Sequence, residues 1–422
     1  MTAPVETERL AAMMRSARQR TLELIDGLTQ EQLIGPKLPT VNPMIWEIGH
    51  VAWFYEQFIL RREHGHAALL ERGDQLYDSI AIAHETRWDL PVYPLDEMLD
   101  YMGSVLETVV GKLGGGLASE RESFLYQFTT LHEDMHDEAF TWARQTHGYP
   151  TPRFAPDGAG ARVTPATGAL AGDADIPGGT FAMGSAPDAA FLFDNEKWAH
   201  DVAVAPFRMG RAPTTNRAFA DFVGDGGYER RDLWCDDGWA WREAARAAHP
   251  VFWKPDGPGG WAVRRFDQWS PLNPDEPVIH VNWYEANAWC RWAGRRLPSE
   301  AEWEFAATMR PGPGGGLVKA RYPWGDDACT PAHANLDGFA LACVDVAAHE
   351  DGDNAWGCRQ MIGNVWEWTE DVFRPFAGFA PDDYKEYSQP LFDITRVLRG
   401  GAWTTRARLA TPTYRNYFGP DR

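Results

Sequence analysis

Two histidines four residues apart, His132 and His136, lie in the segment 131–138. On an α-helix, side chains with this spacing share one face, so the two imidazoles can bind a single metal ion. A third histidine, His50, lies in the strongly apolar helical stretch 44–60. Three neutral imidazoles on one side of a metal leave positions open for a substrate and for oxygen. The pattern predicts a small redox or hydrolytic metal site.

The carboxylates around the two histidines allow several interpretations. Glu138 follows His136 by two residues, and we expect it to accept a hydrogen bond from one metal-binding imidazole. The alternative is a surface ion pair, because neighbouring carboxylates can also pair with histidines on a solvated helix face. Glu133 directly follows His132, as the catalytic base does in zinc hydrolases, so a metal-dependent hydrolase stays open as well.

Four amphipathic stretches before residue 149 predict the element that must position these histidines. Apolar residues recur at helical spacing over about 5–28, 43–64, 95–113 and 118–145. Thr29 and Gln32 have the form of a capping box and predict a short extra turn. A crossover loop joins the second and third helices. Residues 1–148 are therefore predicted to form a four-helix bundle, an architecture that builds metal sites from inward side chains.

The remainder of the chain has a different pattern. Residues 149–175 are rich in Pro, Gly, Ala and Asp without periodicity, which predicts a linker. Short β-type runs separated by turn residues fill 176–422, and only 283–291 and 299–309 look helical. Ser299 is the predicted N-cap of the latter, with Glu302 at the capping-box position.

Composition restricts the class of partner. The formal net charge of −20 repels nucleic acid and anionic membranes. No apolar run reaches transmembrane length, and the first residues lack the order of a signal peptide. Five cysteines without CxxC spacing fit reduced thiols. The sequence thus predicts a cytoplasmic protein acting on small molecules.

Six motifs in the second half are similar to those of the formylglycine-generating-enzyme (sulfatase-modifying-factor) family. That resemblance implies an irregular C-type-lectin-like mixture of short strands and helices over residues 176–422. Formylglycine-generating enzymes carry a copper-binding cysteine pair near the C-terminus, but 411–418 contains no cysteine, so that activity is not expected. The motifs are Ile176–Ser185, Val281–Ala286, Arg296–Glu304, Tyr322–Gly325, Gly363–Thr369 and Arg399–Trp403.

The fusion of a DinB-like helical bundle to such a domain resembles the sulfoxide synthases of ergothioneine biosynthesis and the related selenoneine synthases. The resemblance implies a nonheme Fe(II) held by His50, His132 and His136, with O₂ as co-substrate. It also implies hercynine, the N-trimethylated histidine, as the substrate whose imidazole C2 carbon receives sulfur or selenium. The trimethylammonium group needs aromatic faces or a carboxylate around it.

The resemblance also implies positions that bind the substrates. Asn416 corresponds to a hercynine contact and Arg422 to a donor contact. Met135 stands where the family has a glutamine that hydrogen-bonds hercynine, so Asp134 is the expected substitute. The aromatic candidates for the pocket are Phe376, Phe379, Tyr414, Tyr417 and Phe418.

Departures from the sulfoxide synthases concern the proton donor and the donor substrate. The family's catalytic tyrosine is replaced by Phe376 or Phe379, so we expect Tyr93 of the crossover loop to supply the proton. Phe418 stands where the family has an aspartate that binds the donor's amino group. Arg87, the remaining member of an arginine pair, is the expected donor contact in the crossover loop. These changes favour a selenosugar donor. The alternatives are cysteine or γ-glutamylcysteine in ergothioneine biosynthesis, or a noncatalytic lectin-like binding module.

Overall fold

The computed structural model describes residues 5–154, 167–189 and 191–422. The chain divides into two compact units. Unit 1 comprises Met1–Asp157 and Arg265–Gln268, and unit 2 comprises Gly158–Arg264 and Trp269–Arg422. Residues 155–166 of the predicted linker and the first four residues of the chain lie outside the described part. The first strand of unit 2 begins at Asp173, near the end of the predicted linker.

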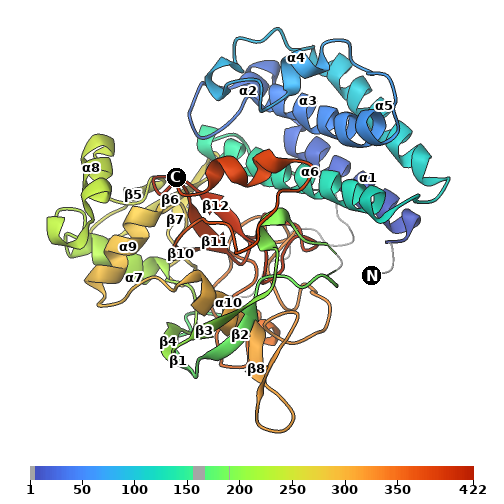
Figure 1. Cartoon of the computed structure of the whole chain (residues 1–422). Helices are drawn as coiled ribbons and strands as arrows, with labels where there is room; N and C mark the ends of the chain where they lie inside the picture. Colours follow the sequence, from blue (N-terminus) through green and yellow to red (C-terminus); the bar gives the residue numbers. More distant parts are fainter. Residues whose placement is uncertain (1–4, 155–166, 190) are drawn as a thin grey trace. The chain divides into compact units, whose positions relative to one another are not determined.

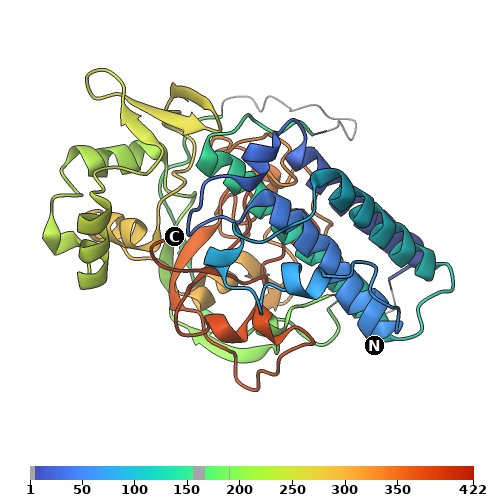
Figure 2. The ribbon, with the colours of Figure 1, turned by 90° about the horizontal axis from the view of Figure 1, so that it is seen from above.

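Unit 1 is built on four long helices, drawn in blue to teal in Figure 1. α1 packs against α5 and α6, and α3 also packs against α5 and α6, so the helices lie side by side (Figures 1 and 2). The predicted four-helix bundle is confirmed. The helices are α1 (Thr7–Ile25), α3 (Met44–Tyr55), α5 (Leu95–Leu113) and α6 (Glu120–His147), and α3 continues as the π-helix η1 (Glu56–Glu63).

Short helices lie in the connections of unit 1. They are α2 (Gln30–Ile34), α4 (Gly73–Tyr77) and the 3₁₀ turn η2 (His84–Thr86). Thr29 and Gln32 form the capping box that the sequence predicts at the start of α2. Every residue of α3 is buried, although the helix includes the polar side chains of Glu47 and His50. Burial of two polar groups on an otherwise apolar helix requires hydrogen-bond partners for both.

Unit 2 contains small antiparallel pairings instead of one large sheet. In the described residues, β1 pairs with β4, β2 with β3, and β8 with β9, while β5–β6–β7 and β10–β11–β12 form three-stranded sheets. The strands are β1 (Asp173–Ile176), β2 (Gly179–Met183), β3 (His200–Val204), β4 (Phe207–Gly210), β5 (Trp253–Pro255), β6 (Trp261–Arg265), β7 (Gln268–Pro271), β8 (Met309–Pro311), β9 (Leu317–Lys319), β10 (Glu367–Val372), β11 (Arg396–Arg399) and β12 (Asn416–Phe418).

The helices of unit 2 correct one expectation. The two predicted helices are present as α9 (Trp283–Trp292) and α10 (Glu300–Thr308), and Ser299 caps α10 with a capping box. The expectation that no other segment is helical is wrong, because α7 (Asn216–Gly224) and α8 (Asp236–Ala245) also form. They are no shorter than α9 and α10, but Ala218 and Gly238 stand at the position where a capping box would have Glu or Gln. The described part of unit 2 also contains the 3₁₀ turns η3 (Asp194–Glu196), η4 (Arg231–Leu233), η5 (Glu350–Gly352), η6 (Lys385–Tyr387) and η7 (Gln389–Leu391).

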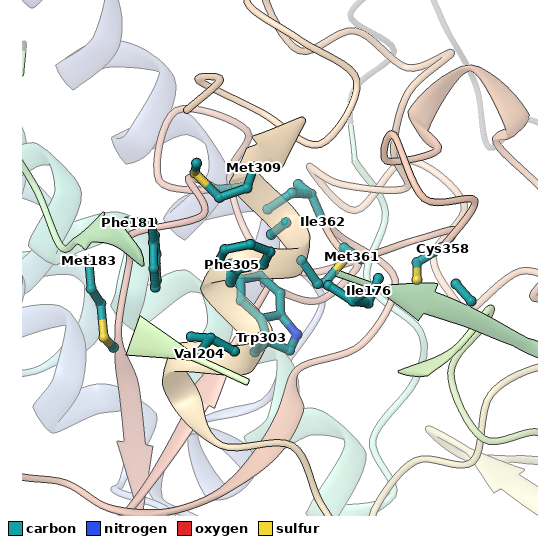
Figure 3. Packing of buried hydrophobic residues seen from close by; sticks show 14 of the residues in the cluster. Ile176, Phe181, Met183, Val204, Trp303, Phe305, Met309, Cys358, Met361 and Ile362 are labelled. Carbon is teal, nitrogen blue, oxygen red and sulfur yellow. The ribbon is translucent and has the colours of Figure 1, made fainter. Parts of the chain in front are cut away.

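The core of unit 2 surrounds α10 (Figure 3). Trp303 and Phe305 of this helix are buried among apolar side chains from β1, β2, β3 and the segment around Met361. The indole nitrogen of Trp303 donates a hydrogen bond to Glu367 at 2.6 Å. Two of the six motifs therefore contact each other and build the domain. The architecture predicted from the sequence, a helical bundle followed by a domain of short strands and helices, is confirmed. Within the described residues, no helix combines the length and apolar character needed to cross a membrane.

Candidate metal centre

Three imidazoles converge inside unit 1. His50 comes from α3, and His132 and His136 come from successive turns of α6. One ring nitrogen of each lies within 4.8 Å of the corresponding nitrogen of the other two. The centroid of the His50 ring is 5.1 Å from that of His132 and 4.9 Å from that of His136. Such a set of nitrogens suits a transition metal ion such as iron.

A hydrogen bond orients the His50 ring, because its Nδ1 atom lies 2.8 Å from the carbonyl oxygen of Tyr77. A carbonyl oxygen only accepts, so Nδ1 carries the proton and Nε2 keeps the lone pair that a metal needs. Gly49 permits this contact, because a Cβ atom at that position would lie 2.2 Å from the Tyr77 ring. The His50 ring also stacks on Trp46, with centroids 5.1 Å apart and an interplanar angle of 7°.

His136 is oriented by a carboxylate. Its Nδ1 atom lies 2.7 Å from Oε1 of Glu47, which is on α3 one turn before His50 and is 1% exposed. The carboxylate therefore accepts the Nδ1 proton and leaves Nε2 for a metal. Sequence reasoning missed Glu47. An acidic side chain in an otherwise apolar helical stretch, three residues before a predicted ligand, is the signal that could have found it.

His132 packs against an aromatic ring. Its imidazole lies parallel to the Phe54 ring with centroids 3.6 Å apart. Burial lowers the pKa of His132 well below its ordinary value, and the neighbouring imidazoles of His136 and His50 lower it further. Burial likewise lowers the pKa of His50, with His136 and Arg87 adding to the effect and the Tyr77 carbonyl opposing it. Both imidazoles are thus neutral, as metal ligands must be.

Glu133 takes part in a buried network with α1. Nε of Arg18 lies 2.7 Å from its Oε1 atom, and the Thr21 hydroxyl donates to the same oxygen at 2.9 Å. Thr21 also lies 2.8 Å from Asp137. This ion pair engages the carboxylate that a hydrolytic mechanism would use as its base, which disfavours the hydrolase alternative.

The other predicted residues of unit 1 lie on α6 and in the crossover loop. Asp134 is buried, Met135 is half-buried, and Glu138 is buried. The predicted contact of Glu138 with an imidazole stays a prediction. Tyr93 is half-buried in the segment between η2 and α5. Burial raises the pKa of the Tyr77 hydroxyl above its ordinary value, and Tyr93 is close enough to Tyr77 to influence that pKa.

Arg87 has a well-defined set of contacts in the crossover loop. Its Nη1 atom donates to Oδ1 of Asn42 at 2.7 Å, and Nη2 donates to the backbone carbonyls of Ser79 and Ile82. Its guanidinium carbon lies 4.0 Å from the centroid of the Trp46 ring.

The remaining predicted substrate residues belong to unit 2. Asn416, Tyr417 and Phe418 form β12, which pairs with β11. The Tyr417 hydroxyl donates to the Tyr387 carbonyl, and its ring stacks on Phe373 with centroids 4.1 Å apart. The Asn416 side chain accepts from the Tyr417 amide at 2.9 Å.

Aromatic packing surrounds the other predicted positions of unit 2. Tyr414 is buried beside Phe193 and Trp366. Arg422 lies over the Phe418 ring, with its guanidinium carbon 5.4 Å from the centroid. Two further contacts complete the set: the guanidinium of Arg415 over Phe376, and an edge contact between Phe379 and Phe392.

Comparison with known proteins agrees with this division. The DinB superfamily matches residues 13–156, and the sulfatase-modifying factor enzyme 1-like domain family matches residues 162–422. A protein named hercynine oxygenase from Mycolicibacterium thermoresistibile is 38% identical over 98% of this chain and 92% of its own length. Proteins of the same name from Mycolicibacterium smegmatis and Mycobacterium tuberculosis are 35% and 36% identical, each over 97% of its own length. The chain therefore belongs to the hercynine oxygenase family, a family of oxygen-dependent enzymes.

Proposed function

We propose that this protein is a nonheme Fe(II)- and O₂-dependent enzyme that joins a chalcogen to the imidazole C2 carbon of hercynine, with a selenosugar as donor. The observation that carries the proposal is the convergence of His50, His132 and His136, whose ligand nitrogens lie within 4.8 Å of one another. The hercynine oxygenase name of the relatives supports hercynine as the substrate.

The three histidines would hold the iron, with His50 and His136 binding through Nε2, since their Nδ1 atoms engage Tyr77 and Glu47. When bound, Fe(II) supplies the one-electron chemistry that O₂ activation needs and an attractive charge for an anionic sulfur or selenium donor. The chain's own contribution is orientation. Two imidazoles are fixed by hydrogen bonds and the third by stacking on Phe54, so the ligand set is formed before the metal arrives.

The overall reaction balances without a further reductant. Joining the C2–H of hercynine to the Se–H or S–H of the donor releases two electrons and two protons. Oxidation of the chalcogen to its oxide releases two more electrons and takes up one oxygen atom. One O₂ therefore ends as that oxygen atom and one water, as the resemblance to sulfoxide synthases implies.

Preference for a selenosugar is supported by the absence, at Phe418 and Arg87, of partners for the charged groups of an amino-acid donor. Phe418 offers no carboxylate for an ammonium group, and the hydrogen bonds of Arg87 go to Asn42 and to backbone carbonyls. Burying a charged head group without a partner is costly. A sugar ring needs neither charge and packs well against aromatic faces.

For hercynine we propose contacts to Asn416, to Asp134 or Met135, and to aromatic rings of unit 2. Tyr414, Tyr417, Phe376 and Phe379 supply candidate faces for the trimethylammonium group. Arg422 is the proposed contact of the donor. These assignments rest on correspondence with the family and on aromatic character.

Tyr93 is the proposed proton donor. Its hydroxyl is the phenol that the crossover loop offers in place of the family's tyrosine. Tyr93→Phe should lower product formation while oxygen consumption persists, because oxygen is then reduced without productive coupling. Product and oxygen are measured together under saturating substrates, and an unaltered product-to-oxygen ratio would remove Tyr93 from the mechanism.

The donor is tested by a direct comparison. The iron-loaded enzyme is given hercynine and air with a selenosugar, cysteine or γ-glutamylcysteine, and products are identified by mass spectrometry. The proposal predicts the highest kcat/KM for the selenosugar, by orders of magnitude where a charged head group finds no partner. Faster turnover with γ-glutamylcysteine would assign the chain to ergothioneine biosynthesis instead. We further propose a cytoplasmic location, supported by five free cysteines.

A further inference from the structure

The crossover loop is fastened to the segment that precedes α3. Nε2 of His84 lies 2.8 Å from the carbonyl oxygen of Val41, and the indole nitrogen of Trp88 donates to the carbonyl of Gly35 at 3.1 Å. The rings of His84 and Trp88 also meet edge to face. These contacts fix the loop on both sides of Arg87.

Because these contacts fix the loop, the guanidinium group of Arg87 lies over the Trp46 ring. Its guanidinium group donates to Asn42, Ser79 and Ile82, while its carbon atom lies 4.0 Å from the centroid of the indole ring. A guanidinium over an indole face is the most favourable common cation–π arrangement. Both Nη atoms and one face of the guanidinium therefore contact groups of the protein.

Trp46 carries the contact to the metal centre. The Trp46 ring lies parallel to the His50 ring, and its indole nitrogen donates to the carbonyl of Leu76 at 2.6 Å. The next residue, Tyr77, accepts the Nδ1 proton of His50. One face of the His50 imidazole therefore contacts Trp46, which Arg87 of the crossover loop covers, and its Nδ1 atom contacts Tyr77 of the same loop.

We infer that Arg87 is a positioning residue for His50, acting through Trp46, in place of the donor-binding role expected from the sequence. The inference rests on the proposed metal centre. It follows from geometry, because Nη1 donates to Asn42 and Nη2 donates to the loop carbonyls of Ser79 and Ile82. Without Arg87, the Trp46 ring loses its cover and the loop loses three hydrogen bonds, so the His50 ring is no longer held in one orientation.

The test separates metal binding from donor binding. The apoprotein is titrated with Co(II), a spectroscopic substitute for Fe(II), and the dissociation constant and visible absorption bands are recorded without any substrate. Arg87→Ala should weaken Co(II) binding by about tenfold and change the bands, the size of effect seen when a supporting partner of a ligand is lost. Asn42→Ala should act in the same direction more weakly. Arg87→Lys keeps the charge but loses the fork of donors and should rescue only in part.

The donor KM is then measured at saturating metal, with a selenosugar and with γ-glutamylcysteine. The inference predicts a KM close to that of the wild type for both donors. An unchanged Co(II) constant and spectrum with a raised donor KM would overturn it and restore the donor-binding role. Unchanged values of both would overturn it as well.

Two controls keep these outcomes distinct from misfolding and from failure of the metal centre. Arg9→Ala removes an exposed arginine of α1 and should leave the Co(II) spectrum unaltered. If Arg87→Ala does not fold, as judged by urea unfolding, Asn42→Ala and Arg87→Lys decide the question. If the wild-type protein binds Co(II) no better than His136→Ala does, the proposed metal centre itself fails, which is a different result from an inert Arg87.

Discussion

At the scale of single residues, Glu47 determines which nitrogen of His136 faces the metal. Replacing it by alanine removes the acceptor 2.7 Å from Nδ1, so the imidazole loses its fixed tautomer and orientation. Loss of such a partner typically costs 10- to 100-fold in metal affinity. We expect Glu47→Ala to weaken Co(II) binding by about that factor, measured by titration of the apoprotein.

Glu138 is the carboxylate that the sequence predicts as a hydrogen-bond partner of a metal-binding imidazole, and its substitution tests that prediction beside Glu47. Glu138→Gln should also lower metal affinity if this carboxylate contacts an imidazole, whereas Glu8→Ala, an exposed position of α1, should not. Wild-type affinity in Glu47→Ala would show that the bond to His136 has no role in metal binding. Wild-type affinity in Glu138→Gln would reject its predicted role alone.

The difference between these two glutamates shows what spacing predicts and what it cannot. His132 and His136 are four residues apart on one helix, so their convergence follows from helical geometry. Glu47 and His136 lie on different helices, so their contact depends on how α3 packs against α6. No local pattern encodes that packing.

At the scale of elements, the close contact between α3 and α4 supports His50. Gly49→Ala would place a Cβ atom 2.2 Å from the Tyr77 ring, and the ring must move together with the carbonyl that orients His50. We expect a loss of about 1–3 kcal/mol in unfolding free energy, as for other overpacked sites, and weaker Co(II) binding. Urea unfolding and metal titration measure the two effects.

Gly103 provides the matched control, because it lies within α5 with nothing near its Cβ position. Gly103→Ala should leave metal binding unchanged and raise the unfolding free energy by up to about 1 kcal/mol, as alanine is favoured over glycine in helices. If Gly49→Ala behaves like Gly103→Ala, the contact with Tyr77 does not constrain the centre.

Helices were predictable where the apolar periodicity was long or where a capping box marked the first turn. The four bundle helices and α10 with its Ser299 cap follow from periodicity and capping residues. α9 and α10 are as short as α7 and α8, but each begins with a capping box, whereas α7 and α8 have Ala218 and Gly238 at the capping-box position and were missed. In α7 only Phe219 and Phe222 repeat as buried aromatic residues, and their partners Tyr228 and Trp253 come from elsewhere in the chain.

At the scale of the whole molecule, buried ionisable groups make stability depend on pH. Burial raises the pKa of Glu285 to about 7, opposed by hydrogen bonds from Tyr228 and Asn282. Because the folded-state pKa lies above the ordinary 4.5, the contribution of this group is fully present below pH 4.5. It is lost as the pH rises through about 7.

Separate carboxylate oxygens of Glu285 accept from the Tyr228 hydroxyl and from the Asn282 amide. Glu285→Gln keeps one acceptor oxygen for these two donors, and its side chain cannot ionise. We therefore expect its unfolding free energy, followed by tryptophan fluorescence, to fall less than that of the wild type between about pH 5 and about pH 8. Glu8→Gln, at an exposed position, is the control and should follow the wild-type curve. Equal pH dependence in the wild type and Glu285→Gln would mean that Glu285 does not titrate in this range.

The central claim is that the three histidines form an iron site that couples oxygen to hercynine. The most direct measurement is iron content after anaerobic loading with Fe(II), followed by oxygen uptake with hercynine and a donor. The wild-type protein should retain iron and consume oxygen only when hercynine is present. His50→Ala, His132→Ala and His136→Ala should each lose both properties, while His66→Ala should keep them. Retention of wild-type iron content and rate in any of the three ligand variants, or zinc binding with no oxygen uptake in the wild type, would contradict the account.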